Sequence, residues 1–404
     1  MPASDALAYP TNTAEPSVAL AAVAAAPPTI TADGPRGLVT DLLPVDHLLA
    51  TARYQSPLRY PGAKSQLAPT IGRLLKAATK SRQVERIELL VEPFAGGASV
   101  SLRMVGAGIV DRVLLADADP LVAAFWQAAA ADTDDLIDRM TYEHTHYVAK
   151  GGQIAVGRWD HWRAWNPPSG KAPMDARLDA AVKALFLNRT SFSGIIHGRA
   201  GPIGGRNQSS TYAIGARFNP EALAKRIEFV GHLYDTGRLL DVWCKDWRGT
   251  LDDAASAYKA LLPSRVVAYL DPPYLEKSEK LYQRSFDPHG GYAAAPVDDL
   301  HWGDPMMHLR LAEYLRREAR FRWVLSYDAH PTLTNSPAMY GTDRMTPDED
   351  TKQLDGVKEW RISKRLVSMR YSATASERTM KDELLLTTLP PSTVPTNHEF
   401  RPLG

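Results

Sequence analysis

Two parts of the chain alternate short apolar runs with helical stretches. In the first part, RIELLVEPF and DRVLLADAD have the length and composition of buried parallel strands. Each is followed by a stretch typical of a helix, ASVSLRMVGAG and PLVAAFWQAAA, and the second of these opens with proline. Upstream, Leu67, Ile71 and Leu74 share one face of a further predicted helix. Strand, glycine turn, helix, strand and helix in this order predict an open parallel sheet.

The same alternation returns near residue 265. RVVAYLDPPY predicts a strand that ends abruptly, because proline lacks the N–H group that a central strand needs. DPMMHLRLAEYLRREA predicts a helix capped by Asp304, and FRWVLSYD predicts another strand. EWRISKRLVSMRYSA and DELLLTTL predict terminal strands, for which a hairpin is one arrangement.

Between about residues 132 and 248 the alternation is lost. Helical stretches at 178–187 and 220–233 flank the glycine-rich stretch SFSGIIHGRAGPIGGRNQSSTYAIGARFN. The predicted fold class is therefore α/β, a Rossmann-like sheet with helices on both faces and an inserted, mostly helical or irregular module. The predicted divisions are a disordered Ala/Pro-rich tail at 1–52, two parts of the sheet domain at 53–140 and 246–390, the module at 141–245, and a flexible tail at 391–404.

Composition excludes several classes of protein. The chain is 44% hydrophobic and 23% charged, which is ordinary for a soluble globular protein. It has neither an apolar window of about 18 residues nor a typical secretion signal, so a cytoplasmic location is expected. The single cysteine, Cys244, excludes an internal disulfide and a Cys-based zinc cluster, and no metal is expected.

The net charge of +1 hides a local asymmetry. The stretch from Ala180 to Pro220 contains no Asp or Glu. Its basic residues are Lys183, Arg189, Arg199, Arg206 and Arg217. A local basic field on a neutral protein indicates a surface for a polyanion. A solvated loop whose acidic partners come from elsewhere in the fold is the alternative.

Two strand ends of the first part carry candidate binding residues. In EPFAGGASV, Gly96 and Gly97 stand where a strand turns into a helix, so a ligand can approach the backbone there. The spacing fits neither the P-loop nor the dinucleotide fingerprint. Asp117 ends the second strand about twenty residues later, where an acid commonly accepts ribose hydroxyls. A tight turn without a ligand, and a helix cap at Asp119, are the alternative roles.

The tetrapeptide Asp271-Pro272-Pro273-Tyr274 follows the strand near residue 265. Its carboxylate and the Pro272 carbonyl are two acceptors that suit the two hydrogens of an exocyclic amine. The ring of Tyr274 can stack on the planar base that carries the amine. A Pro-rich strand end with a cap is the alternative interpretation.

Together these motifs resemble those of the Dam-like DNA adenine-N6 methyltransferases, which use S-adenosylmethionine. The resemblance covers about residues 59–389. Its motifs are RYPGAKSQL, EPFAGGASV, LLADAD and LDPPY, with LNRTSFSG and ARFNP flanking the recognition region and DELLLTTL as the last strand. The resemblance implies a methyltransferase sheet in two parts and a target-recognition role for the module at 141–245. Gly-Ala stands before Lys64 where Gly-Gly is commoner.

The resemblance carries site residues over by position. The implied cofactor-binding residues are Tyr60, Lys64, Phe94, Ala95, Gly96, Gly97, Asp117, Asp246 and Asp271. Among them, Lys64 is expected near the cofactor carboxylate, Asp117 at the ribose and Asp246 at the adenine amine. The implied catalytic residues are Asp271, Pro272 and Tyr274, and the expected DNA-binding residues are Asn188, Arg189, Arg199, Arg206 and Arg217.

The expected function is site-specific transfer of a methyl group from S-adenosylmethionine to N6 of a flipped adenine. Cytosine C5 methylation is disfavoured because it needs a Cys nucleophile, and Cys244 is not in a Pro-Cys loop. Cytosine-N4 methylation and a catalytically silent DNA-binding module remain alternatives. The expected partners are double-stranded DNA, which implies association with the nucleoid, and a cognate restriction or defence-system component, with no membrane.

Overall fold

The computed structural model describes most of the chain outside the N-terminal tail. The described residues are 54–59, 66–80, 86–166, 174–197, 200–274, 302–330, 333, 337–340, 351–354, 357–372 and 378–403. Tyr60, Lys64 and Arg199 lie outside these ranges, as does the predicted disordered tail at 1–52. Within the described part, none of the helices has both the length and the apolar character needed to cross a bilayer.

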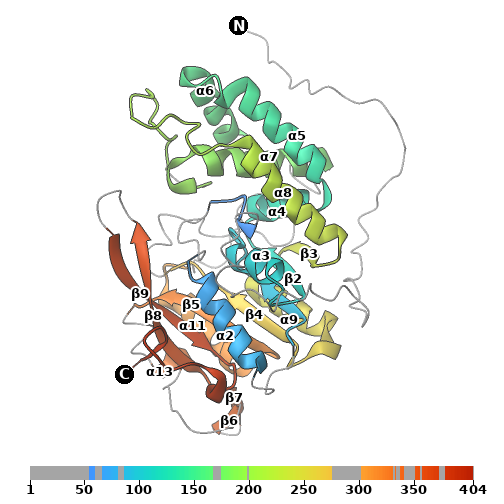
Figure 1. Ribbon diagram of the computed structural model, residues 1–404, viewed down its shortest axis with the longest axis vertical. Helices are drawn as coiled ribbons and strands as arrows, with labels where there is room; N and C mark the ends of the chain where they lie inside the picture. Colours follow the sequence, from blue (N-terminus) through green and yellow to red (C-terminus); the bar gives the residue numbers. More distant parts are fainter. Residues whose placement is uncertain are drawn as a thin grey trace.

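A mixed sheet is the framework of the molecule (Figure 1). Among the described residues it has eight strands in the order β10-β8-β9-β5-β4-β1-β2-β3. The strands are β1 Leu89–Glu92, β2 Arg112–Asp117, β3 Leu239–Cys244, β4 Val266–Leu270, β5 Arg322–Asp328, β8 Ser363–Ser372, β9 Arg378–Thr387 and β10 Arg401–Pro402. The first five pair in parallel, whereas β9, β8 and β10 extend the sheet in antiparallel fashion. The strands β6 Thr351–Leu354 and β7 Val357–Trp360 form a separate antiparallel pair.

The order of the strands reverses at β1. From β1 the chain proceeds to β2 and β3 on one side, and β4 and β5 lie on the other. Helices that follow strands on the two sides of such a point cover opposite faces, so a crevice forms at the carboxyl ends of the strands. The pairs Val91↔Ala268 and Glu92↔Leu115 align the ends of β4 and β2 with the end of β1.

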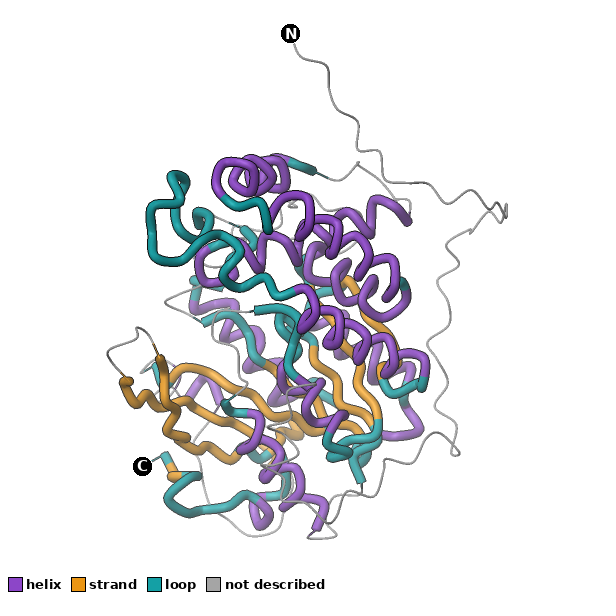
Figure 2. The backbone as a smooth tube through the Cα atoms, turned by 45° about the horizontal axis from the view of Figure 1, so that its top comes forward, coloured by secondary structure: helices purple, strands orange, loops and turns teal. Residues whose placement is uncertain are grey.

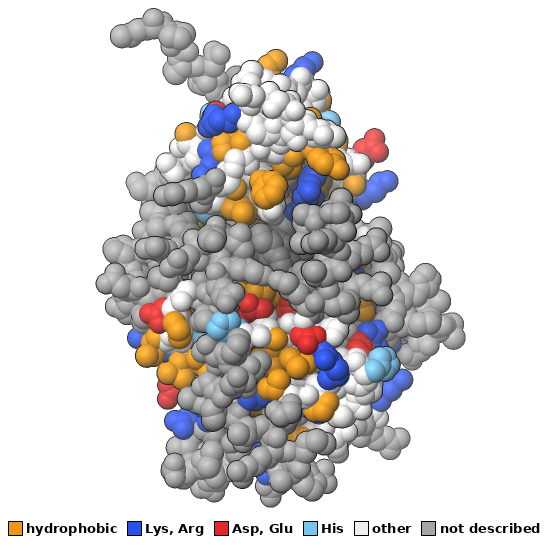
Figure 3. Space-filling model, turned by 90° about the vertical axis from the view of Figure 1, so that its left-hand side faces the viewer, with side chains coloured by type: hydrophobic (Ala, Val, Ile, Leu, Met, Phe, Trp, Pro, Cys, Tyr) orange, Lys and Arg blue, Asp and Glu red, His pale blue; other side chains and the backbone are white. Residues whose placement is uncertain are grey.

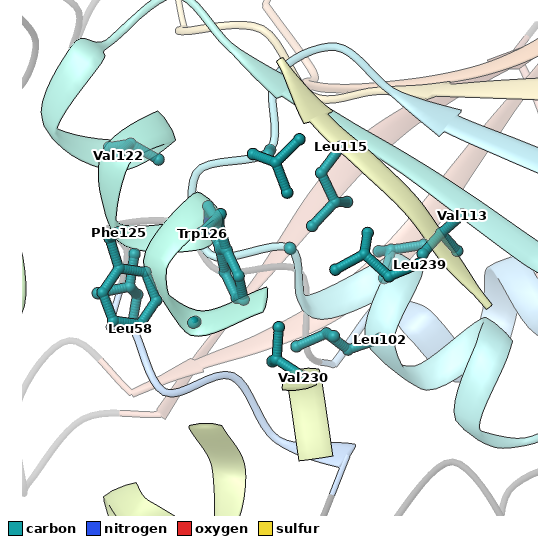
Figure 4. Packing of buried hydrophobic residues seen from close by; sticks show 14 of the residues in the cluster. Leu58, Leu102, Val113, Leu115, Val122, Phe125, Trp126, Val230 and Leu239 are labelled. Carbon is teal, nitrogen blue, oxygen red and sulfur yellow. The ribbon is translucent and has the colours of Figure 1, made fainter. Parts of the chain in front are cut away.

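Alternating side chains of the strands bury both faces of the sheet. On one face, Leu90, Val113 and Leu115 belong to a core with α2 Ala68–Lys80, α3 Ser99–Gly106 and α4 Pro120–Ala131. Figure 4 shows Phe125 and Trp126 of α4 in this core, close to residues of β2, α3 and β3. On the other face, Leu89 and Val91 pack with α9 Trp247–Ala257, α11 Pro305–Arg317 and α13 Pro337–Tyr340. Period-two alternation thus places helices on both faces, as predicted.

Helices gather at one end of the molecule (Figure 2). They are α5 Thr133–Glu143, the π-helical turn η2 His144–Val148, α6 Gly152–Ala164, α7 Met174–Thr190, the 3-10 turn η3 Phe192–Gly194 and α8 Pro220–Asp235. Both α7 and α8 pack against α4, which itself lies on the sheet. In their interior, the buried Arg158 guanidinium donates from Nε to Glu143 Oε2 over 2.8 Å. The helical region is therefore continuous with the core of the sheet domain.

The periodic elements are confirmed. The predicted strands correspond to β1, β2, β4, β5, β8 and β9, and β8 and β9 form the hairpin. Asp304 caps α11 by accepting from the Met306 N–H over 2.8 Å, and Asp119 caps α4 in the same way at Leu121. The predicted boundary at residue 245 is wrong, because β3, within the range 141–245, pairs with β2 and belongs to the sheet.

The predicted flexible tail at 391–404 is also wrong over its described residues. The 3-10 turn η5 Pro391–Thr393 leads to Phe400, which is only 1% exposed, and then to β10, which pairs with β8 at the edge of the sheet. Glu399 accepts hydrogen bonds from Thr70 Oγ1 over 2.6 Å and from Arg73 Nε over 3.1 Å. These contacts attach the C-terminal segment to α2. The Pro-rich composition predicted a flexible tail, but the buried ring of Phe400 and the ion pair of Glu399 order the segment.

We predict that Phe400→Ala lowers the free energy of unfolding by about 3 kcal/mol, because it leaves a cavity in the core beside α2. Thermal unfolding of the purified protein measures the effect. The control is His398→Ala, at an exposed position of the same segment, which should leave the unfolding midpoint nearly unchanged. Equal stability of the Phe400→Ala variant and the wild type would contradict the packing of this segment.

Candidate active site

The ends of β1 and β4 bring two predicted motifs to one edge of the sheet. Val91 pairs with Ala268, and three residues further along each chain come Phe94 and Asp271. Because paired parallel strands advance at the same rise per residue, the glycine turn and the tetrapeptide leave the sheet side by side. Pro272 is buried directly after Asp271.

The glycine turn is held by hydrogen bonds to β2 and α4. The Ala95 N–H donates to the Ala116 carbonyl over 2.9 Å, and the Gly96 N–H donates to Asp117 Oδ2 over 2.7 Å. Trp126 Nε1 donates to the Gly96 carbonyl over 2.8 Å. Gly96 has φ +43°, in the left-handed region that favours glycine, so a side chain here would be strained. The turn is thus preformed.

Asp117 lies at the end of β2 beside the glycine turn. Its Oδ1 accepts from the Asp119 N–H over 2.9 Å. Burial and the neighbouring Asp119 carboxylate raise the pKa of Asp117 to about 7. Asp119 Oδ2 lies 2.6 Å from Nε2 of His197, so the segment after α7 is joined to the same edge. Each Asp117 oxygen has two lone pairs, so the carboxylate can still accept from a ligand hydroxyl.

Glu92, at the end of β1, was not among the predicted site residues. It is buried, and its Oε2 accepts from the Ser101 N–H over 3.2 Å. Burial, with smaller contributions from Asp271 and Asp117, raises the pKa of Glu92 to about 8. An acid at the end of an apolar strand, directly before the glycine turn, is a signal that the sequence contains. Three carboxyl groups therefore interact at this edge of the sheet.

The strands β5 and β9, which follow β4 in the order of the sheet, both contact the tetrapeptide. Ser326 Oγ, on β5, donates to Asp271 Oδ1 over 3.2 Å and lies 2.9 Å from the hydroxyl of Tyr269. The Tyr274 hydroxyl donates to the Glu383 carboxylate on β9 over 3.2 Å. Tyr274 is only 8% exposed and packs in the core of the second face. Both side chains are thus fixed by residues that follow them in the sequence.

Phe94 contacts an aromatic residue that follows the tetrapeptide in the sequence. Its ring lies 5.3 Å from that of Trp302 in an edge-to-face arrangement. His308 of α11 holds this position, since its Nε2 lies 2.8 Å from the Trp302 carbonyl and its Nδ1 lies 2.9 Å from the Tyr327 hydroxyl. Gly97, which follows Gly96, is buried. Trp302 is a further residue of this region that the sequence motifs did not identify.

Asp246 stands beyond the end of β3, at the same edge. The Lys245 N–H donates to the Asp117 carbonyl over 3.1 Å, which brings the two strand ends together. Asp246 Oδ1 accepts from the Gly249 N–H over 2.9 Å and so caps α9. The structure therefore places Asp246 near Asp117 and gives it a role in the fold as well.

Comparison with known proteins defines the protein class. The family model of D12 class N6 adenine-specific DNA methyltransferases matches residues 60–296, more than half of the 404 residues. The chain belongs to this family. It is accordingly an enzyme that methylates adenine N6 in DNA, as predicted, rather than a cytosine-N4 methyltransferase or a silent module. No curated protein matches the chain.

The methyltransferase buries two of the residues expected to bind DNA. Asn188, 1% exposed, accepts from the Arg59 N–H through Oδ1 and donates from Nδ2 to the Arg59 carbonyl, both over 2.6 Å. Arg189 Nε donates to the Pro57 carbonyl over 2.9 Å, and the guanidinium is buried. These contacts hold the segment that leads into Tyr60, and we infer a structural role for both side chains.

Other residues of the basic stretch are on the surface of the methyltransferase. Arg206 is exposed, and its guanidinium donates from Nη2 to Asp160 Oδ1 over 2.7 Å. Arg217 is exposed too. Two large aromatic side chains of the stretch also face solvent, Phe192 at 68% and Tyr212 at 67% exposure. On the face in Figure 3, acidic side chains gather at mid-height, whereas Lys and Arg lie mostly above and below them.

We predict that Glu92→Gln makes the cofactor-free methyltransferase more stable at alkaline pH. A carboxyl with a pKa near 8 in the folded state and near 4.5 in the unfolded chain binds its proton more tightly when folded. Folding stability therefore falls as pH rises between these values, and Gln removes that loss. At about pH 8.5 the gain should be on the order of 4 kcal/mol, and at about pH 5 it should fall below about 1 kcal/mol.

Thermal unfolding at both pH values measures this difference. Glu88→Gln is the matched control, since Glu88 precedes β1 and pairs with Arg265 at the opposite end of the strand. The difference in unfolding midpoint between Glu88→Gln and the wild type should be the same at both pH values. If the difference in unfolding midpoint between Glu92→Gln and the wild type does not change with pH, the raised pKa of a buried Glu92 is contradicted.

Proposed function

We propose that the methyltransferase transfers a methyl group from S-adenosylmethionine to N6 of an adenine swung out of duplex DNA. The observation that carries this proposal is the meeting of Asp271 with the Gly96 turn at adjacent strand ends. The tetrapeptide would hold the adenine amine and the glycine turn would hold the cofactor. The methyl donor and its acceptor would therefore lie in one crevice. Holding the two reactants in this way makes the step effectively unimolecular.

The residues at the strand ends fit such a cofactor. Asp117 and Glu92 are carboxyls in surroundings that penalise their charge, and a cationic ligand would relieve this penalty. Asp117 would accept the ribose hydroxyls, the loop from Phe94 to Gly97 would line the amino-acid portion, and Asp246 would receive the adenine amine. Tyr60 and Lys64, outside the described residues, would complete the site. When bound, S-adenosylmethionine supplies an electrophilic methyl carbon on a sulfonium.

The tetrapeptide would hold and activate the amine. The Asp271 carboxylate and the Pro272 carbonyl would each accept one hydrogen of the adenine NH2, which frees the nitrogen lone pair for attack. The nitrogen would gain the methyl group, a neutral thioether would remain where the methyl was bound, and the nitrogen would then release one proton to Asp271 or to water. Charge stabilisation by Asp271 would therefore matter most in the transition state. No prior removal of the proton is required. Among the described residues, no group of three or more His, Cys, Asp or Glu side chains is arranged to hold a metal ion.

Extrusion of the base needs compensation from the protein. Unpairing and unstacking one base costs roughly a few kcal/mol, and stacking on an aromatic ring returns about 1–3 kcal/mol. Tyr274 would provide the ring in the pocket. Phe192 and Tyr212, exposed on the basic stretch, would contact the bases of the duplex, and Arg217 its phosphates. The helical region would thus recognise the target, and any restriction partner would share that target sequence.

We predict that Asp271→Ala lowers the rate of methyl transfer by a factor on the order of 10²–10³, because an acceptor of the transition-state charge is lost. Incorporation of labelled methyl groups into DNA measures the rate, and calorimetry with S-adenosylmethionine should show nearly unchanged affinity. The control is Asp304→Asn, which replaces one good helix cap with another and should retain activity. Wild-type turnover by Asp271→Ala would refute the proposed function.

We predict that Arg217→Ala lowers the salt dependence of DNA binding. If Arg217 meets one phosphate, the slope of log K against log salt should fall by about 1. Fluorescence anisotropy at several salt concentrations measures the slope. Arg310→Ala, on the exposed side of α11, is the matched control and should leave the slope unchanged. The same slope for Arg217→Ala and the wild type would exclude Arg217 from the DNA contact.

A further inference from the structure

The tetrapeptide leaves the sheet without the support of a strand ladder. Pro272 and Pro273 have no N–H groups, so the two residues cannot donate to a neighbouring strand. Residues 271–274 accordingly have no regular secondary structure. Contacts of their side chains therefore help to orient Asp271 and Tyr274. Two such contacts come from the strands β5 and β9.

The first contact is a relay of hydroxyls that ends at Asp271. Ser326 donates its one hydrogen to Asp271 Oδ1, so the Tyr269 hydroxyl, 2.9 Å away, must donate to Ser326. Burial raises the pKa of Tyr269 well above its ordinary value, so this hydroxyl keeps its proton. Tyr269 and Ser326 are both buried. The relay fixes the position of one carboxylate oxygen of Asp271.

The second contact fixes the ring of Tyr274. Its hydroxyl donates to Glu383, which is 2% exposed and lies on β9 opposite Asp328 of β5. Residues opposite each other in an antiparallel pair project to the same face, and so do residues two apart on one strand. Ser326 and Glu383 are therefore diagonal neighbours on one face. The two contacts form one support behind the tetrapeptide.

We propose that Ser326 and Glu383 are positioning residues for methyl transfer, Ser326 by orienting the Asp271 carboxylate and Glu383 by orienting the Tyr274 ring. This inference rests on the proposed function, since it assigns the catalytic contacts to Asp271 and Tyr274. A carboxylate that rotates away loses its hydrogen bond to the amine, and a ring that tilts loses its stacking contact. Misplacement of about 1 Å can cost on the order of 100-fold in rate.

A double-mutant cycle tests the contact between Glu383 and Tyr274. Glu383→Gln and Tyr274→Phe each weaken or remove the hydrogen bond while keeping the size of the side chain. Each should lower the single-turnover rate, at saturating DNA and cofactor, by roughly tenfold. The double variant should be no slower than the slower single variant, because both changes remove the same contact. Losses that multiply, or no loss at all, would overturn the role of Glu383.

Ser326→Ala tests the relay. It should lower the single-turnover rate by roughly tenfold while leaving the dissociation constants for DNA and cofactor within about twofold. The matched control is Thr387→Ala on β9, which removes a buried hydroxyl that donates to the Trp323 carbonyl, outside the tetrapeptide. The control should lower the unfolding midpoint without a comparable effect on rate. If Ser326→Ala and Thr387→Ala change the rate and the unfolding midpoint equally, Ser326 has a structural role only.

The outcomes separate this inference from the proposed function. If Asp271→Ala still transfers methyl groups, the proposed function fails, whatever the variants of β5 and β9 do. If Asp271→Ala is inactive but Ser326→Ala and Glu383→Gln transfer at the wild-type rate, only the positioning role fails. A rate loss shared by Tyr274→Phe and Glu383→Gln, with unfolding midpoints close to that of the wild type, supports the inference.

Discussion

The parallel pairing of β1 with both β2 and β4 is the constraint on which the site depends. It aligns the carboxyl ends of three strands, so the glycine turn, Asp117 and Asp271 meet at one edge of the sheet. The whole helical region lies between Asp117 and Asp271 in the sequence, yet strand pairing brings the two residues to the same edge.

The same edge concentrates acidic groups. Glu92 and Asp117 both have raised pKa values because burial and neighbouring acids penalise their ionised forms. A cation bound there would be stabilised, whereas a phosphate would be repelled. The DNA backbone must then be held elsewhere, and the exposed Arg217 lies on the helical side of the molecule. The distribution of charge is therefore consistent with the proposal that the cofactor binds at the sheet and the DNA backbone at the helices.

The period of the apolar residues and the spacing of the motifs predicted the sheet, the helices on both of its faces and the order of the motifs. They missed β3, because LLDVWC is short and is interrupted by Asp241, and its identity as a strand comes only from pairing with β2. They missed α6, whose buried Trp159 and Trp162 lie among charged residues. Basic composition marked Arg189 for DNA, and the resemblance of LNRTSFSG to the flank of the recognition region marked Asn188, but neither reports burial. Likewise, no local pattern links Glu383 to Tyr274.

The antiparallel strands extend the site rather than merely closing the sheet. Strand β9 lies between β5 and β8. Its residue Glu383 accepts a hydrogen bond from Tyr274 of the tetrapeptide. Strand β8 carries β10, and the segment before β10 binds α2 through Glu399. Since α2 begins at Ala68, four residues after Lys64, the same C-terminal strands contact both the proposed catalytic residues and the helix that follows the predicted cofactor motif. Their packing therefore supports the candidate site from two sides.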